Sequence, residues 1–332
     1  MSKSDIVLHL QNVTKLYPGQ SMPVVDDISL EVEQGKILAL VGPSGCGKST
    51  TLKMINRLVE YTSGKILVDG RDITEQDPIK LRRKMGYVIQ EVGLFPHMTI
   101  GENISLLPRL EGWANSNIEE RIKYLLAKVG LEPETYSKRY PRELSGGQAQ
   151  RVGVARALAL DPPILLMDEP FGALDPIIRS KLQEEFLAII QEFKKTIVFV
   201  THDLNEALRM GDQVAVMNGG KIIQIGSPQM LLRNSTNKFV SDFIGSDKAV
   251  KLLSISTVGE VLSATNKKTH TPSIQDPENI LDTNISITKN TGALSALEIM
   301  LQNKKTYILV SAGLDDTTNE VLTFDHIMEY VN

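Results

Sequence analysis

The stretch "KILALVGPSGCGKSTTLKM", residues 36–54, decides the fold of the first part of this chain. Its apolar start is typical of a buried strand, and the residues after the glycines are typical of a helix. The loop between them matches the pattern G-x-x-x-x-G-K-[ST]. In such a loop the backbone N–H groups and the helix N-terminus face a phosphate group. We therefore predict a phosphate-binding loop between a strand and a helix.

The side chains of this loop have separate expected roles. Lys48 places its charge on the β- and γ-phosphate oxygens, and the hydroxyl of Ser49 is a ligand for Mg²⁺. The glycines allow the backbone to approach the phosphates closely. The nucleotide-binding residues predicted here are Gly42, Pro43, Ser44, Gly45, Cys46, Gly47, Lys48, Ser49 and Thr50.

Three other apolar runs each end in polar residues. "PILLMDEP" ends in Asp168 and Glu169, "IVFVTHD" in His202 and its neighbours, and "MGYVIQ" in Gln90. Ligands of open α/β sheets bind at the carboxyl ends of the strands, so we expect these side chains to meet there. We predict Asp168, with Ser49 and Gln90, as metal-binding residues, and Glu169, His202 and Gln90 as catalytic residues.

The arrangement of segments predicts an α/β fold with a mixed sheet. Short aliphatic runs alternate with helical patterns, which are expected over 48–58, 176–194 and 203–210. The first 35 residues and "GKILVDGRD" indicate antiparallel strands, and a helical subdomain is expected over about 91–160. We place the end of this domain at residue 245. Residues 246–332 then form a second, small α+β domain, with a long polar loop predicted after residue 265.

Composition excludes several classes of protein. The net charge is −4 and the pI is about 5.8, which disfavours nucleic acid as a partner. The charge lies in the last 88 residues, which contain seven lysines, eleven acidic residues and no arginine. One cysteine excludes an internal disulfide. The first residues lack the apolar core of a signal peptide, and no apolar run is long enough to span a bilayer.

Taken in order, these motifs resemble those of the ATPase subunits of ABC transporters. The resemblance rests on Tyr17, "GPSGCGKST", Gln90, "LSGGQ" at residues 144–148, "ILLMDEP", "GALD" and His202, and it covers about residues 6–245. It implies a P-loop NTPase fold, with ATP and Mg²⁺ as ligands and ATP hydrolysis as the activity.

The resemblance also explains why a second glycine-rich loop follows the first. In that family two copies meet head to tail, and the second loop of one copy covers the γ-phosphate held by the other. The residues implied in this contact are Ser145, Gly146, Gly147 and Gln148, with Asp175 at the interface. Tyr17 is expected to stack on adenine.

Longer stretches, such as "DPIKLRRKMGYVIQEVGLFPHMTI", resemble the ATPases of quaternary-amine importers, which take up glycine betaine, carnitine or choline. The resemblance implies permease subunits as partners, reached through the helical stretch 91–150, in which Leu94, Phe95 and Met98 form an apolar cluster. It also implies an extracytoplasmic binding protein that acts indirectly. It places the chain on the cytoplasmic side of the cell membrane, as a peripheral protein. Two alternatives remain: an importer of another small solute such as an amino acid, and a soluble ABC ATPase that acts on nucleic acid or ribosomes.

The tail resembles one CBS repeat, because residues 286–331 indicate the order β-α-β-β-α. Glu320 replaces the glycine of the usual "G-x-x-T-x-x-D" ending, and Thr323 lies two residues before Asp325 rather than three. We expect this domain to regulate the ATPase. It either senses ionic strength, through repulsion between acidic copies, or binds an adenine-containing or cyclic dinucleotide. The alternative is a packing module that only holds the dimer together.

Overall fold

The computed structural model describes residues 6–90, 93–172, 183, 186–188, 193–265, 286–311 and 320–331. The chain forms two compact units, Met1–Pro228 and Gln229–Asn332. Three predictions lie outside the described residues: the position of Asp175, most of the helix expected over 176–194, and the loop predicted after residue 265. The domain boundary expected at residue 245 stays a prediction.

The first unit contains a mixed sheet with the strand order β10-β9-β3-β8-β7-β6 in its described part. Strands β6, β7, β8, β3 and β9 are parallel to their neighbours, and β10 runs antiparallel to β9. Every residue of β3, β7 and β8 is buried, as expected for central strands covered on both faces. The strands are β3 (Ile37–Val41), β6 (Met85–Val88), β7 (Ile164–Asp168), β8 (Thr196–Thr201), β9 (Gln213–Asn218) and β10 (Lys221–Gly226).

A second sheet of the same unit is antiparallel, with the order β2-β1-β4-β5. Its inward side chains alternate with exposed ones, which is the pattern of a sheet with one wet face. The antiparallel strands predicted from the sequence are thus confirmed. They are β1 (Ile6–Lys15), β2 (Val25–Glu33), β4 (Ser63–Val68) and β5 (Arg71–Asp72).

Helix α1 (Lys48–Ile55) shares one apolar core with both sheets. This core contains Leu10 and Ile66 of the antiparallel sheet, Leu52 of α1, and Leu40 and Val198 of the mixed sheet, all nearly inaccessible to water. Because α1 packs against both sheets, the amino end of the helix is fixed relative to the strand ends beside it.

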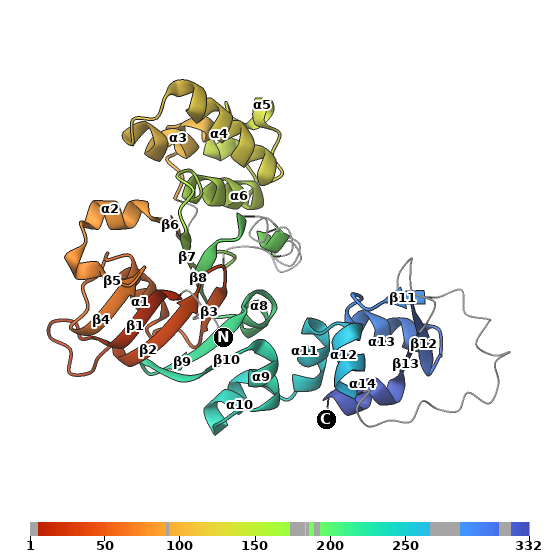
Figure 1. Cartoon of the computed structure of the whole chain (residues 1–332). Coiled ribbons are helices and arrows are strands. Elements are labelled where there is room, and N and C mark those ends of the chain that lie inside the picture. The colour runs from red at the N-terminus through yellow and green to blue at the C-terminus, as the bar shows by residue number, and fades with distance from the viewer. Residues whose placement is uncertain are drawn as a thin grey trace. The chain divides into compact units, whose positions relative to one another are not determined.

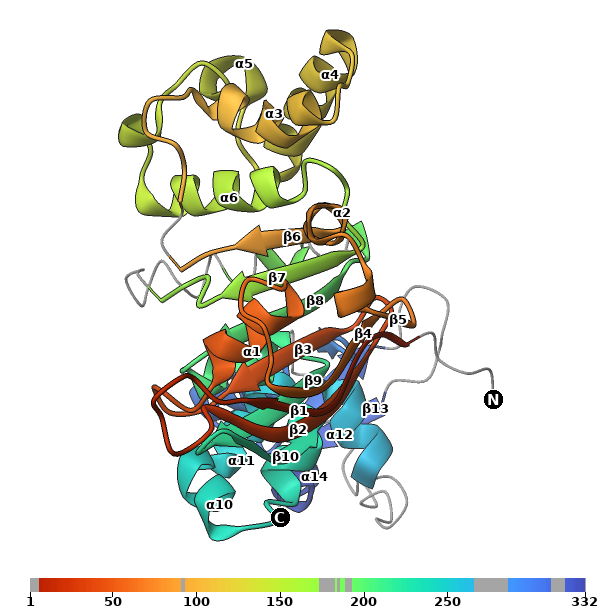
Figure 2. The same cartoon turned by 90° about the vertical axis from the view of Figure 1, so that its left-hand side faces the viewer.

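The predicted helical subdomain is present within this unit. Helices α3, α4 and α5 gather on α6, which packs against the edge strand β6 (Figures 1 and 2). A short helix, α2 (Pro78–Arg83), precedes β6, and α8 (Leu204–Met210) follows β8. The other bounds are α3 (Ile100–Leu110), α4 (Asn115–Lys128), α5 (Pro133–Tyr136) and α6 (Gly146–Ala157).

The second unit has the predicted element order β-α-β-β-α at its carboxyl end. The parallel pair β11 and β12 and the antiparallel pair β12 and β13 form its sheet. Tyr330 ties the unit together, because its ring lies 4.5 Å from the guanidinium of Arg233 and its hydroxyl hydrogen bonds with Ser256. The elements are α9 (Pro228–Arg233), α10 (Lys238–Ile244), α11 (Lys248–Ile255), α12 (Val258–Thr265), β11 (Ser286–Thr288), α13 (Ala293–Gln302), β12 (Tyr307–Ser311), β13 (Glu320–Thr323) and α14 (Phe324–Val331).

Among the described residues, no helix has the length and apolar character needed to cross a bilayer.

Candidate functional site: a nucleotide-binding P-loop

The phosphate-binding loop lies between β3 and α1, where the sequence placed it. Two of its glycines are required by space as well as by backbone angle. A Cβ at Gly42 would lie 2.1 Å from the carbonyl oxygen of Met217, and one at Gly47 would lie 2.6 Å from that of Val24. Gly47 also has a φ of 101°, in the left-handed region that favours glycine. The loop can therefore pass close to the backbone of Val24 and Met217 and continue directly into α1.

Lys48 is the first residue of α1 and is 5% exposed. Its ammonium group donates hydrogen bonds to the carbonyl oxygens of Gly42, at 2.7 Å, and Pro43, at 2.9 Å. In the part of the chain that the structure describes, no carboxylate forms an ion pair with it. A buried cation without an anionic partner is costly. At a helix N-terminus, whose free N–H groups also favour negative charge, this arrangement suits an anion such as a phosphate.

Ser49 links the loop to the second predicted motif. Its hydroxyl donates a 2.7 Å hydrogen bond to a carboxylate oxygen of Asp168, the last residue of β7. Asp168 is 8% exposed. A hydroxyl and a carboxylate side by side are oxygen donors of the type that Mg²⁺ prefers.

Glu169 follows β7 and brings two more predicted residues together. One of its carboxylate oxygens lies 3.3 Å from the amide nitrogen of Gln90 and 3.1 Å from Nδ1 of His202. Its backbone has a φ of 45°, which is unusual for a residue with a side chain. Such conformations are found more often at functional sites than elsewhere. The three side chains come from the ends of β6, β7 and β8, as the sequence predicted. Strand β6 ends at Val88, however, two residues earlier than expected.

The second glycine-rich loop begins helix α6 and has its own cap. The hydroxyl of Ser145 accepts from the backbone N–H of Gln148, and the side chain of Gln148 accepts from the backbone N–H of Ser145. This reciprocal capping box fixes the amino end of α6. Ser145 and Gly146 are exposed, while Gly147 and Gln148 are half-buried. Among the described residues, no hydrogen bond joins this loop to the phosphate-binding loop of the same chain.

Tyr17 lies in the turn predicted from "LYPGQ", where the N–H of Gln20 donates to its carbonyl oxygen. The ammonium group of Lys15 lies 4.8 Å from the centre of its ring. Tyr17 is half-buried, and the Lys15 ammonium group lies over one face of its ring.

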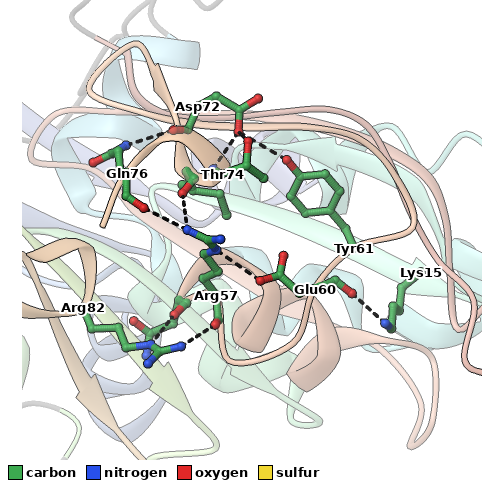
Figure 3. A network of polar contacts seen from close by, with 10 residues as sticks. Lys15, Arg57, Glu60, Tyr61, Asp72, Thr74, Gln76 and Arg82 are labelled. Atoms are coloured by element: carbon green, nitrogen blue, oxygen red, sulfur yellow. Dashed lines mark hydrogen bonds and ion pairs between the residues drawn. The ribbon is translucent and has the colours of Figure 1, made fainter. Parts of the chain in front are cut away.

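Sequence reasoning missed two arginines that hold the opposite end of α1. The guanidinium of Arg82, in α2, donates to the carbonyl oxygens of Asn56, at 3.3 Å, and Arg57, at 2.7 Å. Arg57 in turn donates to the carbonyl oxygens of Ile73 and Gln76 (Figure 3). Cations are favourable at the carboxyl end of a helix, because the last carbonyl groups have no partner within it.

The same network extends to the antiparallel sheet (Figure 3). Glu60 forms an ion pair with Arg57, and its carbonyl oxygen accepts from Lys15 in β1. Asp72 caps the turn at Thr74 and accepts from the hydroxyl of Tyr61. The nucleotide-binding helix is thus anchored at its far end to both α2 and β1. The pair "RR" at residues 82–83 did not predict this anchoring, because basic pairs usually lie in solvent.

The pKa values of two further groups are shifted: those of Cys46, in the loop, and Tyr87, in β6. Burial raises the pKa of the Cys46 thiol, and the nearby charge of Lys48 only partly opposes this. Burial, with a contribution from the negative charge of Asp168, raises the pKa of Tyr87. Both groups are therefore neutral near pH 7.

A buried lysine on a glycine-rich loop, with a hydroxyl and carboxylates at the adjacent strand ends, defines a P-loop nucleotide-binding protein. The chain belongs to the ATP-binding proteins of the ABC transporter family. The family model described as "ABC transporter" matches residues 25–172.

Two curated relatives come from Bacillus subtilis (strain 168). The glycine betaine/carnitine/choline transport ATP-binding protein OpuCA is 54% identical over 74% of this chain, and the match spans 64% of the relative's own length. The choline transport ATP-binding protein OpuBA is 46% identical over 92% of this chain and 75% of its own. Among solved structures, the dimeric ATP-binding cassette MJ0796 bound to ADP and Pi is 34% identical, with a TM-score of 0.59 over 67% of this chain and 98% of that one.

Proposed function

We propose that this protein is the ATP-hydrolysing subunit of a membrane importer for quaternary-amine osmoprotectants. The observation that carries the proposal is the meeting of Glu169 with His202 and Gln90, next to the loop that holds the buried charge of Lys48. These contacts support a role for Glu169 as the carboxylate that accepts a proton beside the proposed phosphate site.

In the proposed reaction, a water molecule attacks the γ-phosphorus and the bond to the β–γ bridging oxygen breaks. Glu169 orients the water and takes its proton, while Lys48 stabilises the charge on the phosphate oxygens. His202 and Gln90 hold the Glu169 carboxylate in place. In-line attack depends on such positioning, because the protein makes no covalent bond to the substrate.

Ser49 and Asp168 are the residues that would hold Mg²⁺. Their oxygen atoms already lie within hydrogen-bond distance of each other. Gln90, whose amide nitrogen contacts Glu169, is the third proposed ligand. When bound, the ion neutralises charge on the phosphate oxygens.

We further propose that two copies form the working site head to tail. The amino end of α6 is capped by its own Ser145 and Gln148, and Ser145 and Gly146 are exposed, which suits a phosphate held by another copy. The dimeric state of the cassette MJ0796 supports this arrangement. Asp175 is proposed to lie at the same interface.

Permease subunits are the proposed membrane partners, which would place the chain at the cytoplasmic face of the membrane. Phe95 is 40% exposed, in a loop whose backbone is fixed by Asn103: the side chain of Asn103 accepts from the N–H of Phe95 and donates to its carbonyl oxygen. A rigidly held apolar group at the surface is typical of a partner contact. The binding protein that selects the solute would act through the permease.

The names of the relatives support quaternary amines as the transported solutes, rather than amino acids. The solute itself would contact the binding protein and the permease, so this chain contributes energy and not selectivity.

For the second unit we propose a regulatory role, with ionic strength as the favoured signal. The Thr323 hydroxyl accepts from the N–H of His326, and the imidazole of His326 accepts from the N–H of Thr323. Thr323 therefore caps α14, which argues against its use on a ribose. Removal of residues 246–332 from the reconstituted importer should preserve uptake and abolish its response to salt. An unchanged response to salt and to cyclic dinucleotides would leave the unit with a packing role only.

The experiment that tests the whole proposal is reconstitution with the candidate permease in vesicles. ATP supplied on the side of this subunit should drive uptake of labelled glycine betaine, carnitine or choline. A Glu169→Gln complex is the matched control, because it should assemble without transport. Uptake of an amino acid instead would favour the alternative importer, and failure to bind any membrane protein would favour a soluble ATPase.

A further inference from the structure

His202 lies in a tight turn between β8 and α8, and the turn has an ordinary helix cap on one side. Asp203 is the N-cap residue of α8. Its carboxylate accepts from the backbone N–H of Asn205, at 2.9 Å, and of Glu206, at 3.4 Å. This satisfies N–H groups that have no partner within the helix.

The other side of the turn is held in an unusual way. Glu206 is the third residue of α8, and in a capping box a glutamate there accepts directly from the N–H of the N-cap residue. Here a hydroxyl stands between them. The N–H of Asp203 donates to the Thr201 hydroxyl at 3.0 Å, and this hydroxyl donates to the Glu206 carboxylate. The result is a capping box extended by one side chain.

The extended box is shielded from water. Thr201 is 1% exposed and Glu206 is 5% exposed. Hydrogen bonds in such surroundings are stronger than at the surface, and a hydroxyl that accepts one bond and donates another strengthens both cooperatively. The box spans residues 201–206 and encloses the backbone of His202.

His202 itself has little packing to fix its direction. Its side chain is 49% exposed, and among the described residues the one hydrogen-bond partner of its imidazole is Glu169. The direction of the imidazole must therefore come from the backbone of the turn, which the extended capping box sets.

We propose that Thr201 and Glu206 are positioning residues for His202, and so for the carboxylate of Glu169. The inference rests on the proposed ATP hydrolysis. Neither residue is expected to touch the nucleotide. The role requires two groups. The first is the Thr201 hydroxyl, which accepts from the N–H of Asp203 and donates to Glu206. The second is the Glu206 oxygen that accepts this hydrogen bond.

Paired variants separate this role from a direct one. Thr201→Val keeps the branched shape and removes the hydroxyl, whereas Thr201→Ser keeps the hydroxyl. We expect kcat to fall about tenfold in the valine variant, because a tenfold change corresponds to the free energy of roughly one to two hydrogen bonds. KM for ATP should stay within about twofold of the wild-type value. The serine variant should retain most of the activity. Asn205→Ala is the control in the same turn, since only the backbone of Asn205 takes part.

Glu206 provides the second pair. Glu206→Gln keeps an acceptor oxygen and should lower kcat less than about threefold, whereas Glu206→Leu should lower it about as much as Thr201→Val. A loss in the glutamine variant as large as in the leucine variant would show that the charge of Glu206 acts directly, and would overturn the proposal.

A double-mutant cycle tests whether the effect passes through His202. In a His202→Ala background, measured by single turnover, Thr201→Val should change the rate less than twofold. A full tenfold loss in that background would show a general effect on the fold and contradict the proposal.

The ¹⁵N spectrum of the imidazole gives a readout that does not depend on catalysis. With the His202 signal assigned by its loss in His202→Gln, the Nδ1 resonance should move toward that of an unbonded imidazole in Thr201→Val and stay in place in Thr201→Ser. If the wild-type protein hydrolyses no ATP but these shifts occur, the proposed function fails and the positioning role stands. An unmoved resonance in Thr201→Val contradicts the positioning role itself.

Discussion

The hydroxyl of Ser49 donates a 2.7 Å hydrogen bond to the carboxylate of Asp168, which lies 119 residues further along the chain. This contact joins the first turn of the nucleotide-binding helix to the end of β7. Glu169, the next residue, is therefore held at a fixed place relative to the phosphate loop.

The Ser49 and Asp168 contact leads to a prediction about metal dependence. Asp168→Asn should leave the affinity for ATP in EDTA within about twofold of wild type, because the phosphate loop is unchanged. The gain in affinity on adding Mg²⁺ should fall by about tenfold, since one charged ligand is lost. Titration of a fluorescent ATP analogue measures both values. A magnesium effect equal to that of wild type would remove Asp168 from the metal site.

Cys46 offers a prediction about pH, because it is the chain's one cysteine. The thiolate is the reactive form, and burial raises the pKa of this thiol above its ordinary value. Alkylation by N-ethylmaleimide should be more than about tenfold slower than that of free cysteine at pH 7.5. The rate should still be rising above about pH 9, where free cysteine is mostly thiolate. MgATP should slow it further; a plateau below pH 8 would contradict the assigned surroundings.

Arg82 and its neighbour Arg83 form a matched pair for stability. Arg82→Ala removes two hydrogen bonds to carbonyl oxygens at the end of α1, and we expect a loss of about 1–3 kcal/mol in the free energy of unfolding. Arg83 pairs with Glu111 at 2.6 Å in a partly exposed ion pair, so Arg83→Ala should cost less than about 1 kcal/mol. Urea unfolding of both variants measures the difference, and equal losses would contradict the anchoring role of Arg82.

Mixing two damaged subunits tests the head-to-tail arrangement. Lys48→Ala should weaken ATP binding by about 10- to 100-fold, since charge-assisted hydrogen bonds are lost. Ser145→Arg should block the covering loop. A mixed dimer has one intact site and one doubly damaged site, whereas each parent dimer has two damaged sites. Mixed samples should therefore form more ATP-bound dimer in gel filtration. The same amount of dimer in all three samples would indicate that the loop acts within its own chain.

The sequence predicted the parts of the site that are set by strand ends. Residues 164–167 and 197–200 are continuous apolar runs, so the ends of these strands, and hence the positions of Glu169 and His202 just after them, follow from burial alone. Parallel pairing then brings these ends together. The mixed sheet was predicted for the same reason, whereas the antiparallel sheet was predicted from the first 35 residues and "GKILVDGRD".

The residues that support the site without belonging to it were not predicted. Arg57 and Arg82 act on backbone carbonyls, and the sequence carries no record of which carbonyls a long side chain will reach. Thr201 and Glu206 were missed although "THDLNE" contains a signal: an N-cap aspartate with a glutamate three residues later predicts a capping box. The insertion of the threonine hydroxyl depends on the geometry of the strand end, which only the structure gives.

The central claim is that Glu169 is the residue that activates water for ATP hydrolysis. The most direct measurement compares single-turnover hydrolysis and ATP binding in wild-type protein and in Glu169→Gln. The amide keeps the shape but cannot accept the proton, so the account predicts ATP affinity within about threefold of wild type, a stable ATP-bound dimer and a rate lower by about 10²–10⁴-fold. Hydrolysis by Glu169→Gln at near the wild-type rate would contradict it.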